Sequence, residues 1–322
     1  MADVPNGGSP RDSFLLVMAV LGMLALPAAL TLHTARVPAV VDVAVTNPSP
    51  YGYTVSLLLF IVPIIVIAFW FVPREGVRIS KRSFVRTIGL LFPLGVILDF
   101  FFAHLFLTFP RPGATLGIPA PALHGSVPIE EYVFYLTGFT AMLLMYIWFD
   151  KYWLAAYSVP GDSPERADFA KLISFHPMSL IITVLLIVAA IAYKRFVAHE
   201  TTGFPGYFTF LVIAGMGPSI VLFPSALPVV NWRAFSLTLF ILLLTSLLWE
   251  ATLAVPYGWW GYQPEQMMGL RITAWGYLPI EAVVVWIAVC YQTVIVYEVI
   301  KRWQGSGRKA RHAFLGSGKA AA

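Results

Sequence analysis

The sequence predicts an all-α, polytopic membrane protein with about eight transmembrane helices, arranged as two parallel four-helix repeats. Of its 322 residues, 59% are hydrophobic and only 11% are charged, whereas soluble domains carry roughly 25% charged residues. The mean hydropathy is +0.78. Runs of about 20 apolar residues are long enough to cross a bilayer as helices. Eight such runs occur, near residues 14–35, 52–72, 84–108, 129–149, 171–193, 205–224, 234–256 and 277–299.

A pair of acidic residues within these runs recurs at one fixed spacing. Asp99 and Glu130 are 31 residues apart, and so are Glu250 and Glu281. The second pair follows the first by 151 residues, and Glu130 and Glu281 each end a Pro-Ile-Glu sequence. This pattern predicts a tandem duplication of the membrane domain.

The offset divides the chain into two membrane repeats, over residues 14–150 and 151–302. Because each repeat contains an even number of helices, the two copies are expected to run parallel, related by an axis along the membrane normal. The polar segment 1–13 and the basic, Gly/Ser/Ala-rich segment 303–322 are expected to be disordered tails.

The distribution of basic residues predicts the orientation. With the N-terminus inside, the 21 Lys and Arg residues divide 16 to 5 in favour of the inner side. The positive-inside rule then places both termini in the cytoplasm of a multi-pass protein of the cell membrane. The formal net charge of +5 therefore indicates topology and contact with anionic membrane lipids, with no nucleic-acid partner.

Acidic residues at membrane depth are candidates for a functional site, because placing a charge there is unfavourable. Asp99 and Glu250 lie inside apolar runs with no Lys or Arg close in sequence, so both are expected to face the interior of the bundle. A carboxyl group buried without a cation is most stable protonated, and in that form it can donate a proton. The alternative role is an interhelical hydrogen bond that only holds the helices together.

The motif glutamates are expected at the starts of helices. Proline suits the first helical turn, and the positive end of the helix favours a carboxylate there. Glu130 and Glu281 fit this pattern, either as functional acids or as ordinary helix-start residues. Glu131 has no counterpart, because Ala282 occupies the equivalent position. Since neighbouring helical residues point roughly 100° apart, Glu130 and Glu131 cannot share one direction, and the first repeat is favoured as the catalytic half.

Aromatic residues accompany the acids. Membrane proteins commonly place such residues at the lipid–water interface. The alternative is that their π-faces stabilise a cationic intermediate. The candidates for that role are Tyr132, Phe134, Trp249, Trp260 and Tyr262.

Signatures of several other membrane enzymes are missing from the sequence. It contains no His-rich cluster of the di-iron type, no Asp-rich pair for magnesium diphosphate and no lysine in the middle of an apolar run. It also lacks a Gly-x-Gly-x-x-Gly nucleotide motif. We therefore expect no metal and no cofactor.

The run Pro128-Ile-Glu-Glu-Tyr-Val-Phe134, with its echo Pro279-Ile-Glu281, resembles the membrane-integral lycopene cyclases of the bacterial heterodimeric, archaeal and fungal type. Trp249-Glu250 and the run from Trp260 to Glu281 are similar to the segments that lead into the second motif of that family. The resemblance covers roughly residues 52–149 and 205–299.

The resemblance implies cofactor-free isomerisation of a linear carotenoid. A carboxylic acid protonates a terminal double bond, an internal alkene closes a six-membered ring, and a base removes a proton. The family implies that Glu130, Glu131 and Glu281 are catalytic, assisted by Asp99 and Glu250. The implied partners are a hydrophobic polyene or polyprenyl substrate, membrane lipids and other enzymes of the carotenoid pathway.

Three alternatives remain open at this point. A carotenoid hydratase or isomerase would use the same first protonation and end the reaction differently. A proton-coupled transporter would also use repeats and membrane-embedded acids. An inactive partner of a carotenoid pathway would fit the second motif, which reads Glu-Ala at residues 281 and 282.

Overall fold

The computed structural model describes residues 49–160, 163, 168–198 and 203–316. Within these ranges, seven helices are long and apolar enough to cross a membrane, which confirms the prediction of an all-α, multi-pass membrane protein. Each begins and ends within six residues of a predicted apolar run. The predicted run 14–35 and the predicted tail 1–13 lie outside the described residues. The seven spans are Gly52–Arg74, Lys81–Phe106, Ile129–Trp153, Pro177–Phe196, Gly206–Ala226, Trp232–Tyr257 and Glu281–Gly305.

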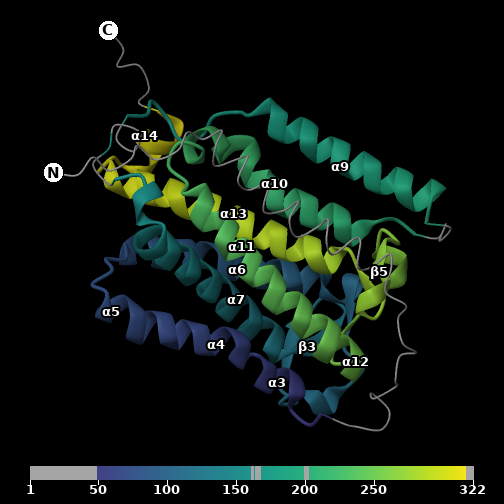
Figure 1. Cartoon of the computed structure of the whole chain (residues 1–322). Helices are drawn as coiled ribbons and strands as arrows, with labels where there is room; N and C mark the ends of the chain where they lie inside the picture. Colours follow the sequence, from purple (N-terminus) through teal and green to yellow (C-terminus); the bar gives the residue numbers. More distant parts are fainter. Residues whose placement is uncertain (1–48, 161–162, 164–167, 199–202, 317–322) are drawn as a thin grey trace.

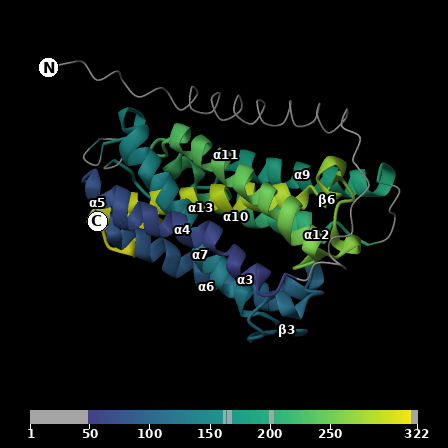
Figure 2. The same ribbon diagram turned by 60° about the horizontal axis from the view of Figure 1, so that its bottom comes forward.

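Helix α13 (Glu281–Gly305) occupies the centre of the bundle (Figures 1 and 2). It contacts α6 (Lys81–Phe106), α7 (Ile129–Trp148), α10 (Gly206–Ala226) and α11 (Trp232–Trp249). The apolar side chains that these helices bury against one another form a core that runs along the bundle. Every functional side chain described below is attached to this core or to the loops at one of its ends.

The outermost helices show apolar faces that match a lipid surrounding. Helix α4 (Leu58–Ile65) packs on α7, and α9 (Pro177–Phe196) packs on α10 at the opposite side of the bundle (Figure 1). Large apolar side chains on their outer faces are exposed, for example Leu185 on α9 at 61%. A soluble protein rarely exposes long continuous apolar faces, so these surfaces are suited to contact lipid chains.

Gly215 explains how helix α10, formed by the glycine-containing run near 205–224, packs in the bundle. A Cβ atom at this position would lie 2.9 Å from the Cβ of Ala288 on α13. The missing side chain therefore lets α10 and α13 approach closely, which is the usual way in which membrane helices pack through small residues. Pro218 and Pro224 lie inside the same helix without ending it.

Three two-stranded antiparallel sheets lie at the end of the bundle opposite to α14 (Ala310–Leu315) (Figures 1 and 2). Two of the sheets are hairpins that precede α7 and α13. The third sheet joins the loop after α6 to the loop after α12 (Val255–Tyr257), pairing Leu107 with Tyr262. The strands are β1 (Leu107–Thr108), β2 (Pro119–Ala122), β3 (Gly125–Pro128), β4 (Gly261–Tyr262), β5 (Arg271–Ile272) and β6 (Leu278–Pro279).

The basic segment after residue 302 differs from the predicted disordered tail over its described part. Helix α13 continues to Gly305, and α14 follows. Ala313 of α14 is fully buried and its carbonyl accepts a hydrogen bond of 2.8 Å from Leu172 N–H. The sequence pattern missed this contact because the segment is polar and short, and its packing depends on a distant loop.

Buried polar groups join the two halves of the chain at the α14 end of the bundle. The Asn231 side chain accepts a hydrogen bond from Ala234 N–H at 3.1 Å, which caps α11. Its amide donates to the Asp150 carboxylate at 3.0 Å, at the end of the α7 span. Asp150 also lies 3.1 Å from the ammonium group of Lys151 and 3.8 Å from that of Lys301. One asparagine therefore caps a helix and connects it to a buried ion-pair network.

Replacing Asn231 by alanine is expected to destabilise the folded protein by about 1–3 kcal/mol, because it removes a helix cap and leaves a buried carboxylate with one donor fewer. Thermal unfolding of the purified protein in detergent measures this loss. Asn231→Ser keeps an oxygen for the cap but removes the amide donor, so its melting temperature should fall between those of wild type and Asn231→Ala. A wild-type melting temperature for the alanine variant would contradict this account.

Candidate active site

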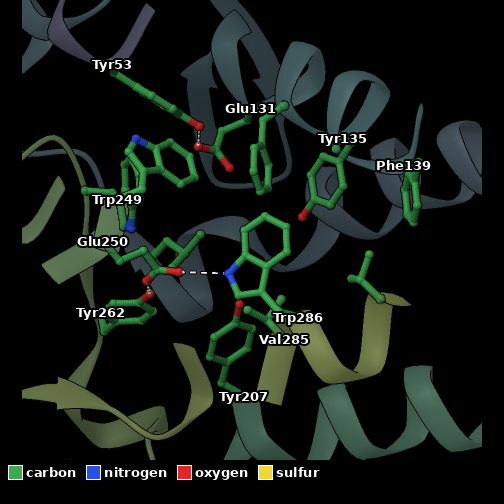
Figure 3. A pocket seen from close by; sticks show the side chains of 15 residues that line it. Tyr53, Glu131, Tyr135, Phe139, Tyr207, Trp249, Glu250, Tyr262, Val285 and Trp286 are labelled. Carbon is green, nitrogen blue, oxygen red and sulfur yellow. Dashed lines mark hydrogen bonds between the residues drawn. The ribbon is translucent and has the colours of Figure 1, made fainter. Parts of the chain in front are cut away.

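A cavity lies between the helices near the strand-bearing end of the bundle, and we call it the central cavity (Figure 3). Its walls come from α3 (Gly52–Ser56), α7, α10, α11, α13 and the loop that follows α12. Most of its lining is apolar or aromatic. The polar and aromatic side chains on which its chemistry depends are Tyr53, Glu131, Trp249, Glu250, Tyr262 and Trp286.

Two buried glutamates face the central cavity from different helices (Figure 3). Glu131, in the first turn of α7, accepts a hydrogen bond from the Tyr53 hydroxyl at 2.5 Å. Glu250, at the end of α11, accepts one from the indole N–H of Trp286 at 3.1 Å and another from the Tyr262 hydroxyl. Each carboxyl group is therefore held by aromatic donors from other segments, and this compensates for part of the unfavourable burial.

The Tyr262 phenol remains protonated in this arrangement. It lies in the loop between two membrane spans, and both its burial and the adjacent Glu250 carboxylate raise its pKa well above the usual value for tyrosine. It therefore acts as a hydrogen-bond donor to Glu250 at any pH at which the protein is expected to work.

Local backbone structure helps to position Glu250. Helix α11 ends at Trp249, and Glu250 opens a π-helical turn over Glu250–Ala254. Such turns insert an extra residue into a helix and are frequent at functional sites. Asp99, which occupies the equivalent position in the first repeat by sequence, lies within the regular part of α6.

A second cavity adjoins the central cavity, and we call it the Asp99 cavity. It lies between α6 and α10 with α13 behind it, and Asp99, Phe102, Tyr135, Phe210, Ala214 and Gln292 are among its lining residues. The Tyr135 hydroxyl donates to Asp99 Oδ1 at 3.3 Å, and the second oxygen, Oδ2, is buried without a hydrogen-bond partner among the described residues. Tyr135, Phe139 and Tyr207 line both cavities and form the wall between them.

The hydrogen bonds of Asp99 and Glu250 have the same spacing in the sequence. Tyr135 follows Asp99 by 36 residues, and Trp286 follows Glu250 by 36 residues. Both donors lie one turn into the helix that carries the motif glutamate, α7 or α13. The acid–aromatic pair is therefore repeated at the offset of 151 residues, with tyrosine in one copy and tryptophan in the other.

Glu130 and Glu281 lie away from both cavities. Glu130 accepts hydrogen bonds from Leu116 N–H at 2.7 Å and from the Thr54 hydroxyl at 2.5 Å. Glu281 accepts one from Met268 N–H at 2.6 Å. In each copy the glutamate thus fixes the loop that leads into its own helix. One oxygen of each, Glu130 Oε2 and Glu281 Oε2, is buried and has no hydrogen-bond partner within the described residues.

The helix starts differ slightly from the prediction. Glu130, Glu131 and Glu281 all lie in the first turn of their helices, as expected. Pro128, however, is the residue that precedes the first turn of α7, and Pro279 lies in β6 before α13 begins. Both prolines pair with the neighbouring strand, so the hairpin extends up to the helix and the helix starts after the proline.

Most of the candidate cation-stabilising residues surround the central cavity. Phe134 and Trp249 have ring centroids 5.6 Å apart, and Trp249 and Trp260 have centroids 4.7 Å apart. Tyr262 also lines the cavity, as described above. Tyr132 does not: its hydroxyl donates to the carbonyl of Pro121 in β2 at 2.5 Å, so it belongs to the hairpin. The aromatic rings present π-faces and edges to any positive charge in the cavity.

Neither cavity is lined by a Lys, Arg or His side chain from the described part of the chain. No group of three His, Cys, Asp or Glu side chains in these ranges converges closely enough to hold a metal ion. Each cavity has a volume of about 80 Å³. Because a water molecule needs about 10–15 Å³ by the same measure, each has room for roughly five to eight heavy atoms, about the size of one isoprene unit.

Sequence reasoning missed four tyrosine and tryptophan residues that line the cavities: Tyr53, Tyr135, Tyr207 and Trp286. The repeat offset would have identified two of them, because residues 135 and 286 are 151 apart and each lies 36 residues after an intramembrane acid. Tyr53 and Tyr207 carry no comparable signal. They reach the site only because α3 and α10 pack beside the central cavity.

The loop-anchoring role of Glu281 predicts different effects for two substitutions. Glu281→Ala leaves the buried Met268 N–H without an acceptor and should lower the free energy of unfolding by about 1–3 kcal/mol. Glu281→Gln keeps a carbonyl oxygen for this hydrogen bond and should lose clearly less. Thermal unfolding and limited proteolysis of the loop around Met268 measure the difference. Equal losses in both variants would show that the acceptor at Met268 is not what residue 281 provides.

Comparisons of this chain with protein-family models, with curated proteins and with solved structures find no match.

Proposed function

We propose that this protein is a membrane-embedded isoprenoid cyclase that closes a ring at the end of a linear carotenoid by acid–base chemistry without redox change. The supporting observation is the set of three buried carboxyl groups, Asp99, Glu131 and Glu250, around two adjoining aromatic cavities that no basic residue lines within the described ranges. Such a site can deliver a proton, surround a carbocation with π-electrons and accept a proton.

Glu250 is suited to accept the proton. An indole N–H can only donate a hydrogen bond, so the Trp286 contact requires an acceptor oxygen on Glu250. Tyr262, which stays protonated, donates to the other oxygen. Two donors on one carboxyl group favour its ionised form. An anionic Glu250 also stabilises positive charge in the central cavity until the proton is removed.

Glu131 is suited to donate the proton. Its partner within the described residues, Tyr53, engages Oε1 only. The other oxygen is therefore available to carry a proton on the side of the central cavity, where the end of a substrate would lie. Once the proton has left, the Tyr53 hydroxyl stabilises the resulting carboxylate. Asp99, across the wall formed by Tyr135, is placed to assist from the adjoining cavity.

The conversion of the substrate balances with these groups, and proton exchange with water afterwards reloads Glu131 and removes the proton from Glu250. The proton of Glu131 adds to the terminal double bond of the substrate and creates a tertiary cation. The electrons of the next suitable double bond attack this cation, which forms the carbon–carbon bond of a six-membered ring and moves the positive charge to a ring carbon. Loss of a neighbouring proton to Glu250 forms the ring double bond. One proton enters and one leaves, so the product has the mass of the substrate.

The Asp99 cavity offers a route from the lipid to the reaction site. Leu94 lines this cavity and is 44% exposed on α6, so the cavity reaches the outer surface of the bundle. Its other lining side chains between α6 and α10 are largely apolar. Because each cavity holds only about one isoprene unit, the rest of a long polyene would lie between these helices and in the bilayer.

The helix bounds support two parallel repeats. Helix α6 and the span Trp232–Tyr257 coincide at an offset of 151 residues, and the hairpins, acids and acid–aromatic pairs recur in the same order. With residues 14–35 as a further helix, each repeat would contain four. Of the described basic residues, only Arg111, Lys194, Arg195 and Arg271 belong to the strand-bearing end of the bundle. This distribution favours the α14 end as the cytoplasmic side of the cell membrane, in keeping with the sequence-based expectation that both termini are cytoplasmic.

The alternatives predict other products from the same site. A hydratase would quench the first cation with water, an isomerase would move a double bond without closing a ring, and a transporter would leave its substrate unchanged. Incubation of lycopene with the purified protein in D₂O distinguishes the cyclase, the hydratase, the isomerase and the transporter by the product that each gives. A cyclase gives a product with one deuterium for each ring formed, a blue-shifted absorption spectrum and shorter chromatographic retention.

Glu131→Gln and Glu250→Gln are expected to lower the rate of ring formation by at least about 100-fold, because acid–base groups contribute about 10²–10⁴-fold to such reactions. The matched control is Glu130→Gln, the same substitution at the neighbouring residue, whose side chain faces the Leu116 loop. This variant should retain activity within about tenfold of wild type. Product formation from lycopene, followed by chromatography and mass spectrometry, measures these rates. Size-exclusion chromatography of each variant in detergent verifies folding.

Three outcomes would contradict the proposal: a Glu130→Gln variant less active than Glu131→Gln, a product heavier than lycopene by one water, or a folded wild-type protein that leaves both lycopene and shorter linear polyprenes unchanged. The first would transfer the catalytic role to the loop-facing glutamate. The second would identify a hydratase. The third would remove the enzymatic assignment.

A bulky side chain in the Asp99 cavity is expected to hinder substrate entry. Ala214→Trp fills the space between α6 and α10 and should reduce conversion of lycopene by about tenfold or more. Ile213→Trp is the matched control, because Ile213 is adjacent, 54% exposed and directed to the lipid side. Its activity should remain near wild type. Equal activity of the two folded variants would exclude this route.

A further inference from the structure

A large cleft at the α14 end of the bundle contains a concentration of positive charge, and we call it the basic cleft. Its volume is about 670 Å³. Its walls are the start of α6, the end of α13 and the linker to α14, which lie together at this end of the bundle (Figure 1). Seven basic residues line it: Lys81, Arg82, Arg86, Lys301, Arg302, Arg308 and Lys309. None of the described residues that line it is acidic.

Four of the seven basic side chains are held in place by protein groups. Lys301 pairs with Glu298 at 2.8 Å, and Arg302 donates to the carbonyl of Ser225 at 3.0 Å. Arg308 donates to the carbonyl of Phe169 at 2.6 Å, and the Arg86 guanidinium lies 4.7 Å from the centroid of the Trp303 ring. These contacts fix four cations around the cleft.

The remaining three cations, Lys81, Arg82 and Lys309, are exposed and form no ion pair within the described residues. Two further sets of hydrogen-bond donors at the cleft also favour a site for an anion. Gln304 Nε2 is buried without a hydrogen-bond partner in the described part of the chain. The first-turn N–H groups of α6 receive no side-chain cap from Ser80. Donors and positive charge without an acceptor are the chemical complement of a phosphate group.

The exposed face of α6 continues from this charge into an apolar stripe. Arg82, Arg86, Leu90 and Leu94 follow one another at intervals of four residues, so they lie along one face of the helix, and Ile97 continues it. Leu90 and Ile97 are each 53% exposed. A molecule that binds along this face meets cations at one end and lipid-facing hydrocarbon over the next turns, which is the arrangement of charge and hydrocarbon in a phospholipid.

We propose that the basic cleft binds the phosphodiester headgroup of an anionic phospholipid, with the acyl chains lying along the Leu90, Leu94 and Ile97 face of α6. Clusters of cations at the cytoplasmic ends of membrane helices attract anionic lipids by about 1 kcal/mol for each basic residue. The cleft is large enough for a headgroup with two phosphates. This assignment does not depend on the reaction at the central cavity, although Leu94 also lines the Asp99 cavity.

Native mass spectrometry of the full chain in detergent tests the proposal, with tetraoleoyl cardiolipin and dioleoyl phosphatidylglycerol as probes and dioleoyl phosphatidylcholine as the zwitterionic control. The triple variant Lys81→Gln/Arg82→Gln/Lys309→Gln should bind the anionic lipids at least about tenfold more weakly than wild type. The control triple variant Arg74→Gln/Arg78→Gln/Arg195→Gln loses the same charge outside the cleft and should bind within about twofold of wild type. Thermal unfolding of each variant without lipid verifies folding.

Equal loss of binding in the two triple variants would overturn the proposal, because attraction would then follow net charge and not the cleft. Binding of phosphatidylcholine as tight as that of the anionic lipids would also overturn it. Competition with millimolar inorganic diphosphate distinguishes the source of the phosphate. Displacement of the lipid by diphosphate at concentrations where sulfate has no effect would reassign the cleft to a soluble phosphate ligand.

Discussion

The burial of carboxyl groups among apolar helices is the constraint on which the rest of this structure depends. A carboxyl group in such a place needs hydrogen-bond donors, and no basic side chain of the described part of the chain lines either cavity to provide them. Aromatic donors provide them here: Tyr53 for Glu131, Tyr135 for Asp99, and Trp286 with Tyr262 for Glu250. The same side chains also line the cavities. The aromatic side chains that donate hydrogen bonds to the buried carboxyl groups are therefore also the ones that would surround a carbocation.

The sequence pattern at the offset of 151 residues recurs in the contacts of the structure, and the two halves differ at particular positions. The acid, the hairpin, the loop-anchoring glutamate and the aromatic donor occur in both copies. Glu131 occurs only in the first, since Ala282 replaces it in the second. If two acids had identical surroundings, neither would be favoured over the other as proton donor or as proton acceptor. One added glutamate, and a donor-only tryptophan in place of a tyrosine, make the two sides of the central cavity chemically different.

Adjacent residues in a motif can have opposite roles. Glu130 and Glu131 follow one proline and look equivalent in the sequence, but one faces the Leu116 loop and the other faces the central cavity. The repeated spacing predicted that residues 130 and 281 correspond, and both accept a hydrogen bond from a backbone N–H of the loop before their helix. It could not show that what they share is a structural contact, because a conserved distance between two acids reflects any duplicated function, including the anchoring of a loop.

Composition and spacing by themselves determined the all-α membrane architecture and the positions of the seven described spans. They also determined the burial of Asp99 and Glu250. The reason is that apolar length and the unfavourable burial of charge are local properties of a helix. Only the tertiary structure decided which acids meet. Tyr53 and Tyr207 reach the central cavity from helices far away in the sequence, and Tyr132 turns to a hairpin instead. The basic cleft likewise exists only because the end of α13 and the linker to α14 lie beside the start of α6. Side-chain direction and helix packing set these contacts, and neither is encoded in the spacing of residues along one segment.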